Sequence, residues 1–329
     1  MSFFAVLFAL LIEQIKPLPR NNPVHESLTG WMRWTGRNFD AGQDHHAWVV
    51  WCISVLVPTV LAAGVHMAIA HFSLLLALAW DVAVLYLTLG FRQFSHHFTE
   101  IRDALDRGDE IQARQLLAQW SRVDASELPR TELLRHVIEH SLIAAHRHVF
   151  GVFFWFVLLS TFGLGPAGAV LYRLAELAHR YWAVKGRNMG APVNERVMGL
   201  SQSLFTAIDH VPSRLTAFGF AVVGNFEEAI TCWRRDAGLW SQRNDGVVLA
   251  AAAGAVGVQL GGSADPRVIV EPLRPLDGAD PSEDAAPAGA TTGATPVAGH
   301  LRSVVGLVWR SVVLWMLLLA LLSLANLVG

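Results

Sequence analysis

Three long apolar runs constrain the fold of this chain more than any other feature. Residues 48–72 contain no Asp, Glu, Lys or Arg, residues 73–91 contain only Asp81, and residues 304–328 contain only Arg310. A helix needs about 20 mainly apolar residues to cross the hydrocarbon core of a bilayer. Strand patterns are nearly absent, and helices satisfy their backbone groups within lipid. The chain is therefore expected to be all-α, a polytopic helical membrane protein with these three runs as spans.

Two shorter or interrupted apolar runs need separate treatment. Residues 1–15 have no Lys or Arg before the run and no small-residue cleavage site after it, so we expect a retained anchor and not a signal peptide. Residues 149–172 are interrupted at 163–166 by Gly-Leu-Gly-Pro. A full crossing there would place the basic residues that follow outside the cell. We therefore expect a broken or re-entrant helix, or one paired with 215–224.

The positions of Lys and Arg predict the orientation. They gather at 16–47 and again between the end of the second run and residue 147, and loops rich in these residues tend to stay cytoplasmic. Residues 91–120 have the spacing of two amphipathic helices separated by a turn at 107–109, and residues 133–142 repeat apolar side chains at helical spacing. We therefore expect cytoplasmic amphipathic helices beside the spans.

The low charge content excludes one class of partner. Only 16% of the residues are charged and the formal net charge is −2, so nothing favours binding to nucleic acid, and the expected partner is the lipid bilayer. Residues 263–299 are rich in Gly, Ala, Pro and Asp and cannot form a core. The expected organisation is a helical membrane domain over 1–262, a flexible linker over 263–299 and a C-terminal transmembrane helix over 300–329.

Asp81 and Arg310 are the ionisable residues inside the long runs. Such groups are costly in lipid and usually face the bundle interior or a polar cavity, so the two could pair. Arg310 is also near enough to the end of its helix to reach the interface. The histidines at 45–46, 96–97 and 146–148 flank apolar runs, and we expect them to lie at the membrane interface.

Residues 136–140 match the HxxEH pattern, which on a helix places His136 and His140 one turn apart beside Glu139. A zinc hydrolase uses this arrangement, and the alternative is a polar helix face on which the match is accidental. No third ligand can be identified. Walker, Rossmann and GxSxG motifs are absent, so the usual markers of nucleotide binding and acyl transfer are missing.

Several segments together resemble the CobD/CbiB superfamily of membrane proteins and, within it, the AmpE branch. They cover most of the chain: a proline-rich turn at 19–24, the segment 89–114 with its Gly-Asp turn, the stretch 154–173, the motif at 209–215 and the glycine-rich end at 252–262.

The resemblance implies a choice between two functions. The enzymes of the superfamily are adenosylcobinamide-phosphate synthases, which join an aminopropanol unit to a corrinoid carboxylate with ATP and magnesium. The acidic and amide groups of such a site are largely replaced here, at 139–148, 176–179 and 205–206, where Glu139 is kept. The resemblance thus implies an AmpE-like, non-catalytic accessory or sensory protein of the bacterial inner (plasma) membrane, linked to cell-wall recycling and β-lactamase induction, with no cofactor expected.

Four charged residues are candidates for binding: Arg20, Glu139, Asp209 and Arg214. The first hypothesis is that they form a groove, near the cytoplasmic helices, for a protein partner or a small ligand. Capping and interhelical salt bridges are the structural alternative. The second hypothesis is a cobalamin-pathway synthase with a rearranged site, which would form an amide between cobyric acid and aminopropanol or its phosphate and would need ATP and Mg²⁺.

Overall fold

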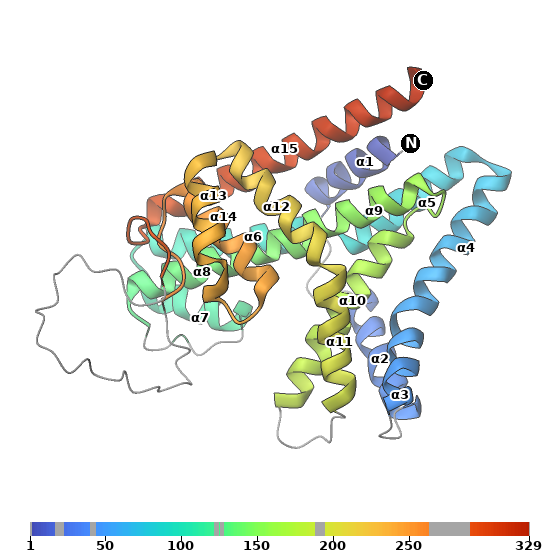
Figure 1. The fold of residues 1–329 in the computed structure, drawn as a ribbon, viewed down its shortest axis with the longest axis horizontal. Helices are drawn as coiled ribbons and strands as arrows, with labels where there is room; N and C mark the ends of the chain where they lie inside the picture. The colour runs from blue at the N-terminus through green and yellow to red at the C-terminus, as the bar shows by residue number, and fades with distance from the viewer. Residues whose placement is uncertain are drawn as a thin grey trace, which may run out of the picture. The chain divides into compact units, whose positions relative to one another are not determined.

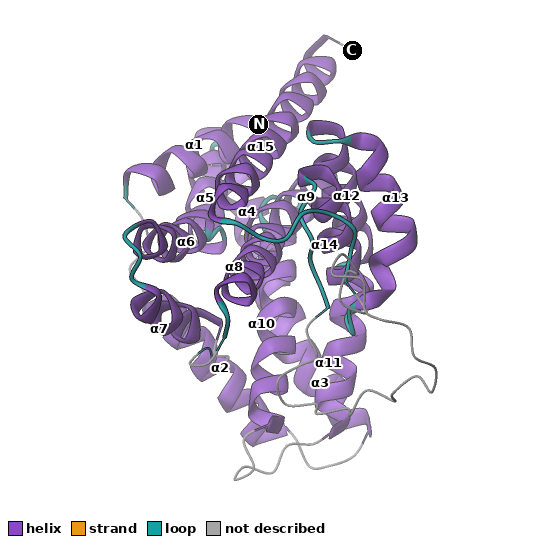
Figure 2. Cartoon of the chain, turned by 90° about the vertical axis from the view of Figure 1, so that its left-hand side faces the viewer, coloured by secondary structure: helices purple, strands orange, loops and turns teal. Residues whose placement is uncertain are grey.

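The computed structural model consists of helices joined by short loops. It describes residues 2–16, 23–39, 44–121, 125, 128–187, 195–262 and 290–328. Every regular element within these ranges is a helix (Figure 2), and the only ladder pairings there are two isolated bridges. The prediction of an all-α fold is confirmed for the part of the chain that the structure describes.

The chain divides into two compact units. Unit 1 comprises Met1–His96, Ala144–Ser213 and Val312–Gly329, and unit 2 comprises His97–Ile143 and Arg214–Ser311. The helices that lie within unit 1 are α1 (Ser2–Ile15), α2 (Pro23–Phe39), α3 (Asp44–Trp51), α4 (Val57–Phe72), α5 (Leu74–Thr88), α9 (Gly151–Thr161), α10 (Ala167–Arg187) and α11 (Glu195–Ile208) (Figure 1).

Unit 2 contains fewer complete helices, and four helices contribute residues to both units. Those within unit 2 are α7 (Glu110–Ser121), α13 (Phe226–Asp236) and α14 (Arg243–Val256). Those that the boundary divides are α6 (Phe91–Asp106), α8 (Arg130–Ala145), α12 (His210–Val223) and α15 (Ala298–Val328).

Among the residues that the structure describes, three helices are long and apolar enough to cross a membrane. They are His45–Phe72, in which a π-helical turn joins α3 to α4, Arg130–Thr161, in which another joins α8 to α9, and Ala298–Ala325 of α15. Apolar side chains such as Leu61 of α4 and Leu321 of α15 are exposed, which is unfavourable in water and favourable in lipid. These features suit a membrane protein.

The second predicted span differs from the expectation. Helix α5 covers only Leu74–Thr88, so at 1.5 Å per residue it is about 22 Å long, shorter than the hydrocarbon core of about 30 Å. The backbone becomes extended at Leu89 and ends the helix there. Helix α5, like α1, is a short apolar helix and does not have the length of a complete span.

The predicted break at 163–166 is present. Helix α9 ends at Thr161, Gly163 and Gly165 adopt positive φ angles, and α10 begins at Ala167. The two helices then pack closely, because a Cβ atom on Gly168 would lie 1.8 Å from the carbonyl oxygen of Trp155. The first part of the apolar run therefore completes the long helix Arg130–Thr161, and the chain reverses after it.

Unit 2 is built around α13 and α14. Asn225 caps α13 by accepting from the backbone N–H of Glu228, and α14 is buried along most of its length. The segment expected to be a linker is described only from Ala290, and its residues 290–297 pack in this unit. Gln259 donates its N–H to the carbonyl of Ala294, and the side chain of Thr291 is fully buried. The final helix then begins at Ala298.

Candidate functional site

Glu139 and Arg135 of α8 together hold both backbone polar groups of Gly261. Oε1 of Glu139 accepts the N–H of Gly261 at 2.7 Å, and Nη1 of Arg135 donates to its carbonyl at 2.7 Å. The two side chains are four residues apart, so they lie on one face of the helix. Arg135 also pairs with Glu132. The structure thus joins the glutamate that is kept from the superfamily pattern to the glycine-rich end at 252–262.

The HxxEH residues of α8 do not gather around a common point. Glu139 is bound to Gly261, the ring of His140 packs edge-on against Trp120 with centroids 4.4 Å apart, and Nε2 of His136 is buried without a hydrogen-bond partner. Within the described ranges no group of three or more His, Cys, Asp or Glu side chains could hold a metal ion. The zinc hypothesis gains no support from this geometry.

Asp209, at the junction of α11 and α12, is the centre of a buried network in unit 1. Its Oδ1 accepts from Nε2 of His146 at 2.8 Å and from the hydroxyl of Tyr172 at 2.7 Å, and the residue is 1% exposed. Burial opposes its ionisation, but the field of His146 and these two hydrogen bonds outweigh burial, so the pKa of Asp209 is lowered. Burial, reinforced by the Asp209 charge, raises the pKa of Tyr172 well above its ordinary value.

A local irregularity places His146 in this network. His146 begins the π-helical turn His146–Phe150 between α8 and α9, a form of helix that is rare and often occurs at functional sites. Gly151 follows it, and a Cβ atom there would lie 2.2 Å from the ring of Tyr172. The glycine therefore leaves room for Tyr172 to reach Asp209. The expectation that the histidines at 146–148 lie at the interface is wrong for His146, which is completely buried.

A second carboxylate in unit 1 lies between two arginines of α10. Glu176 is 2% exposed, and its oxygens are 3.2 Å from Nη1 of Arg173 and 3.5 Å from Nε of Arg180. Burial would raise its pKa, but the charges of Arg180 and Arg173 outweigh it and lower the pKa to about 2. Burial lowers the pKa of Arg173, with Glu176 opposing the shift. Close by in sequence, His179 stacks on Phe205 with the ring centroids 5.3 Å apart.

We call the set His146, Tyr172, Arg173, Glu176 and Asp209 the buried polar cluster. Its residues lie in or next to three stretches, 139–148, 176–179 and 205–206. These are the stretches in which the superfamily's acidic and amide positions are replaced. Part of this cluster could be predicted from the sequence, because arginines stand three residues before and four residues after Glu176, on the same face of a helix. The pairing of His146 with Asp209, 63 positions apart, has no such local signal.

The remaining predicted site residues have separate surroundings. Nη1 of Arg214 donates to Oδ1 of Asn244 at 3.3 Å within unit 2. Arg20 lies outside the described residues. Asp81 is 6% exposed, and Nδ1 of His66, in the preceding helix, lies 2.8 Å from its Oδ1. Arg310 is exposed, and its Nε donates to the carbonyl of Gly306 in its own helix.

Comparison with known proteins gives a consistent family. Residues 3–265 match the family described as "CobD/Cbib protein". The "Cobalamin biosynthesis protein CobD" of Stutzerimonas stutzeri (strain A1501) is 31% identical over 326 residues, which are 96% of each chain. The protein of the same name from Chromobacterium violaceum is 35% identical over 215 residues, 62% of this chain and 65% of that one. No solved structure matches.

These comparisons correct the functional expectation. The expected AmpE-like accessory or sensory protein is wrong, because the matching relatives are named for cobalamin biosynthesis and nothing indicates a separate AmpE-like branch. The error arose from treating replaced acidic positions as a lost site.

Proposed function

Because the chain belongs to the CobD/CbiB family, we propose that it is an enzyme of cobalamin biosynthesis, which forms an amide between cobyric acid and aminopropanol or its phosphate. The observation that carries the proposal is the end-to-end relation to a protein named for this pathway. A relation over 96% of each chain is too extensive to rest on one shared module, so it concerns the membrane helices and the glycine-rich end together.

The contact between Glu139 and Gly261 supports the proposal. It ties α8 to the glycine-rich end, two regions 122 positions apart in sequence. The carboxylate and the guanidinium bind the two successive peptide groups on either side of the Cα atom of Gly261, and together they fix its orientation more tightly than either bond alone, because charge-assisted hydrogen bonds are the strong ones. We assign Glu139 and Arg135 as positioning residues that hold the glycine-rich end for substrate.

Amide formation from a carboxylate and an amine requires activation, and ATP with Mg²⁺ would supply it. The described residues do not form a site for Mg²⁺ by themselves. They include no cluster of three or more potential metal ligands, and Glu139, Glu176 and Asp209 are each already bound to protein donors. We therefore assign no step to a metal held by these carboxylates. The buried polar cluster is internally paired, and we assign it to holding α10 and α11 to the π-helical turn.

We further propose that the enzyme is embedded in the bacterial inner membrane by several helices. The three long apolar helices found among the described residues support this placement, and the shorter helices α1 and α5 are also apolar.

Genetic complementation tests the proposal. A bacterium that lacks its own synthase and depends on cobalamin is given this gene and is supplied with cobyric acid, the proposed substrate, or with cobinamide, which already carries the amide. The proposal predicts growth on both, whereas the empty vector allows growth on cobinamide only. Growth of the complemented strain on cobinamide but not on cobyric acid, with the protein detected in its membranes, would overturn the proposal.

A further inference from the structure

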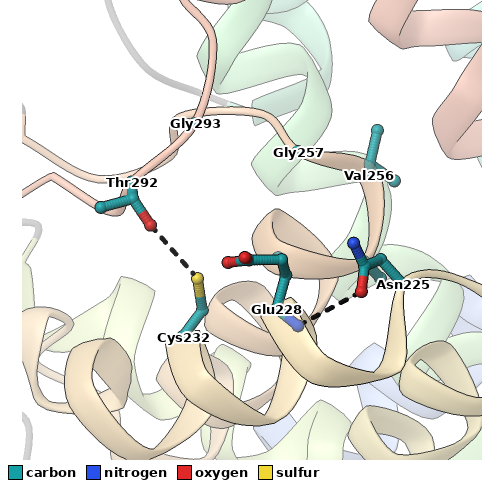
Figure 3. A pocket seen from close by; sticks show the side chains of 9 residues that line it. Asn225, Glu228, Cys232, Val256, Gly257, Thr292 and Gly293 are labelled. Atoms are coloured by element: carbon teal, nitrogen blue, oxygen red, sulfur yellow. Dashed lines mark hydrogen bonds between the residues drawn. The ribbon is translucent and has the colours of Figure 1, made fainter.

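Several arginines of the described chain have carboxylate partners. In unit 2, Arg235 bonds the two oxygens of Asp236 at 2.6 and 2.7 Å. Glu228, which lines the small pocket drawn in Figure 3, also interacts electrostatically with Arg235. In unit 1, Nη1 of Arg173 is 3.2 Å from a carboxylate oxygen of Glu176. The charges of such arginines are balanced within the protein and leave little attraction for a partner.

Three cations of unit 1 have no such partner. Arg33 and Arg37 of α2 are exposed and stand four residues apart, so they share one face of the helix. Lys185, near the end of α10, is partly exposed. Among the residues that the structure describes, none of these three cations forms an ion pair. Their charge is therefore open to a partner outside the chain.

A tryptophan brings the three cations to one place. The indole of Trp182 in α10 lies against α2, because a Cβ atom on Gly36 would be 2.3 Å from its Cη2. Nζ of Lys185 is 5.3 Å from the centroid of the same ring. Arg37 follows Gly36 directly, and Arg33 is one helical turn earlier. We call Arg33, Arg37 and Lys185 the basic patch.

The basic patch lies beside the beginning of a helix that can cross a membrane. Helix α2 packs against α3 (Figure 1), and Oγ1 of Thr35 is 2.8 Å from Oγ of Ser54 in the π-helical turn that follows α3. The helix His45–Phe72 has 28 residues. At 1.5 Å per residue it is about 42 Å long, enough to cross the hydrocarbon core of about 30 Å and to enter the headgroup layers. Tryptophans concentrate in these layers, and Trp34 and Trp48 are 47% and 51% exposed. We therefore expect the basic patch at the level of the lipid headgroups.

We propose that the basic patch binds the headgroups of anionic phospholipids. A guanidinium presents its N–H groups in a planar fork that matches phosphate oxygens, and cations near a membrane surface are attracted by anionic lipids. The attraction is local, because the whole chain has a formal net charge of −2 and does not favour an anionic surface. Lipid binding of this kind requires neither ATP nor a corrinoid, so it goes beyond the amide-forming activity and does not depend on it.

The test measures lipid dissociation constants by native mass spectrometry of the full chain in detergent. Dioleoylphosphatidylglycerol and dioleoylphosphatidylcholine have the same acyl chains and differ in headgroup charge, and glycerol phosphate is the soluble probe of the same phosphate chemistry. The glutamine variant combines Arg33→Gln with Arg37→Gln, and the lysine variant combines Arg33→Lys with Arg37→Lys. The control variant combines Arg234→Gln with Arg243→Gln, which removes two exposed arginines of α13 and α14 that form no ion pair with described residues.

The proposal predicts that wild type and the control variant bind phosphatidylglycerol more tightly than phosphatidylcholine. The glutamine variant should bind phosphatidylglycerol about ten-fold more weakly and phosphatidylcholine as before, because each cation near an anionic surface strengthens binding about five-fold. The lysine variant keeps the charge and should bind phosphatidylglycerol more tightly than the glutamine variant does. An unchanged unfolding temperature of the glutamine variant shows that its fold is intact.

Four results would each overturn the proposal. They are equal binding of the two lipids by wild type, unchanged binding of phosphatidylglycerol by the glutamine variant, an equal loss in the control variant, and a lysine variant as weak as the glutamine variant. Glycerol phosphate that binds as tightly as phosphatidylglycerol would show a site for a soluble anion and would overturn the assignment to lipid.

Discussion

His146 and Asp209 form a completely buried pair, with Nε2 of His146 2.8 Å from Oδ1 of Asp209 and side-chain exposures of 0% and 1%. The hydroxyl of Tyr172 donates to the same oxygen. One carboxylate therefore satisfies donors from two other helical segments, the π-helical turn and α10, and links both of them to the junction of α11 and α12.

Asp209→Asn should destabilise the protein. The amide can still accept both hydrogen bonds, but it loses the charge that strengthens them, so the free energy of unfolding should fall by about 2 kcal/mol. Asp106→Asn is the control, because Asp106 is an exposed carboxylate of α6, and exposed substitutions change stability by about 0.5 kcal/mol or less. Thermal or denaturant unfolding in detergent measures both. Equal stability of the two variants would show that the His146–Asp209 pair does not stabilise the fold.

The contribution of Glu176 should depend on pH. Its pKa is lowered from 4.5 to about 2 in the folded chain, so its stabilising effect is complete above about pH 4.5 and is lost as the pH falls towards 2. The shift corresponds to about 3 kcal/mol at neutral pH. The stability difference between wild type and Glu176→Gln should therefore shrink as the pH is lowered from 5 to 3. A difference that stays constant over this interval would contradict the assignment.

Gly168→Ala should disrupt the hairpin of α9 and α10. The added methyl group would lie 1.8 Å from the backbone oxygen of Trp155. Because a backbone atom cannot rotate away as a side chain can, the free energy of unfolding should fall by about 1–3 kcal/mol. Gly199→Ala is the matched control. Nothing lies within 4 Å of its position in α11, so it should raise stability by up to about 1 kcal/mol through helix propensity. The unfolding temperatures of the two variants should move in opposite directions.

Glu139→Ala should release the glycine-rich end. The N–H of Gly261 then loses its acceptor, and exchange of this amide with deuterium should become faster, as measured by mass spectrometry on a peptide that covers residues 256–262. Glu139→Gln keeps an oxygen that can accept the bond and should stay close to the wild type in exchange. If Glu139→Ala exchanges no faster than Glu139→Gln, the proposed positioning role is wrong.

The sequence was sufficient for the fold class because hydrophobic length is a local property. The runs at 48–72 and 304–328 lie within long helices, and the glycines at 163 and 165 marked the break between α9 and α10, although the sequence left open whether the chain turns back there. Helix length was less predictable, because the backbone turns extended at Leu89 although the side chains around it remain apolar.

The candidate site was only partly predictable, because its contacts join residues that are far apart in the sequence. Glu139 and Asp209 were recognised from the segments around them, but their partners, Gly261 and His146, come from distant positions. His66 stands in an uncharged run, and nothing in its own segment identifies Asp81 as its partner. Reading each replaced acidic position separately also hid the fact that Arg173 and Arg180 surround Glu176 on one helix.

The most direct test of the proposed function is amide formation by the purified chain in detergent. Cobyric acid is incubated with aminopropanol or its phosphate, ATP and Mg²⁺, and the corrinoid is identified by mass spectrometry, with an active synthase assayed in parallel. We predict a product whose mass is that of the two joined substrates less one water, formed over many turnovers and only with ATP. Unchanged cobyric acid, under conditions in which the parallel synthase converts it, would contradict the account.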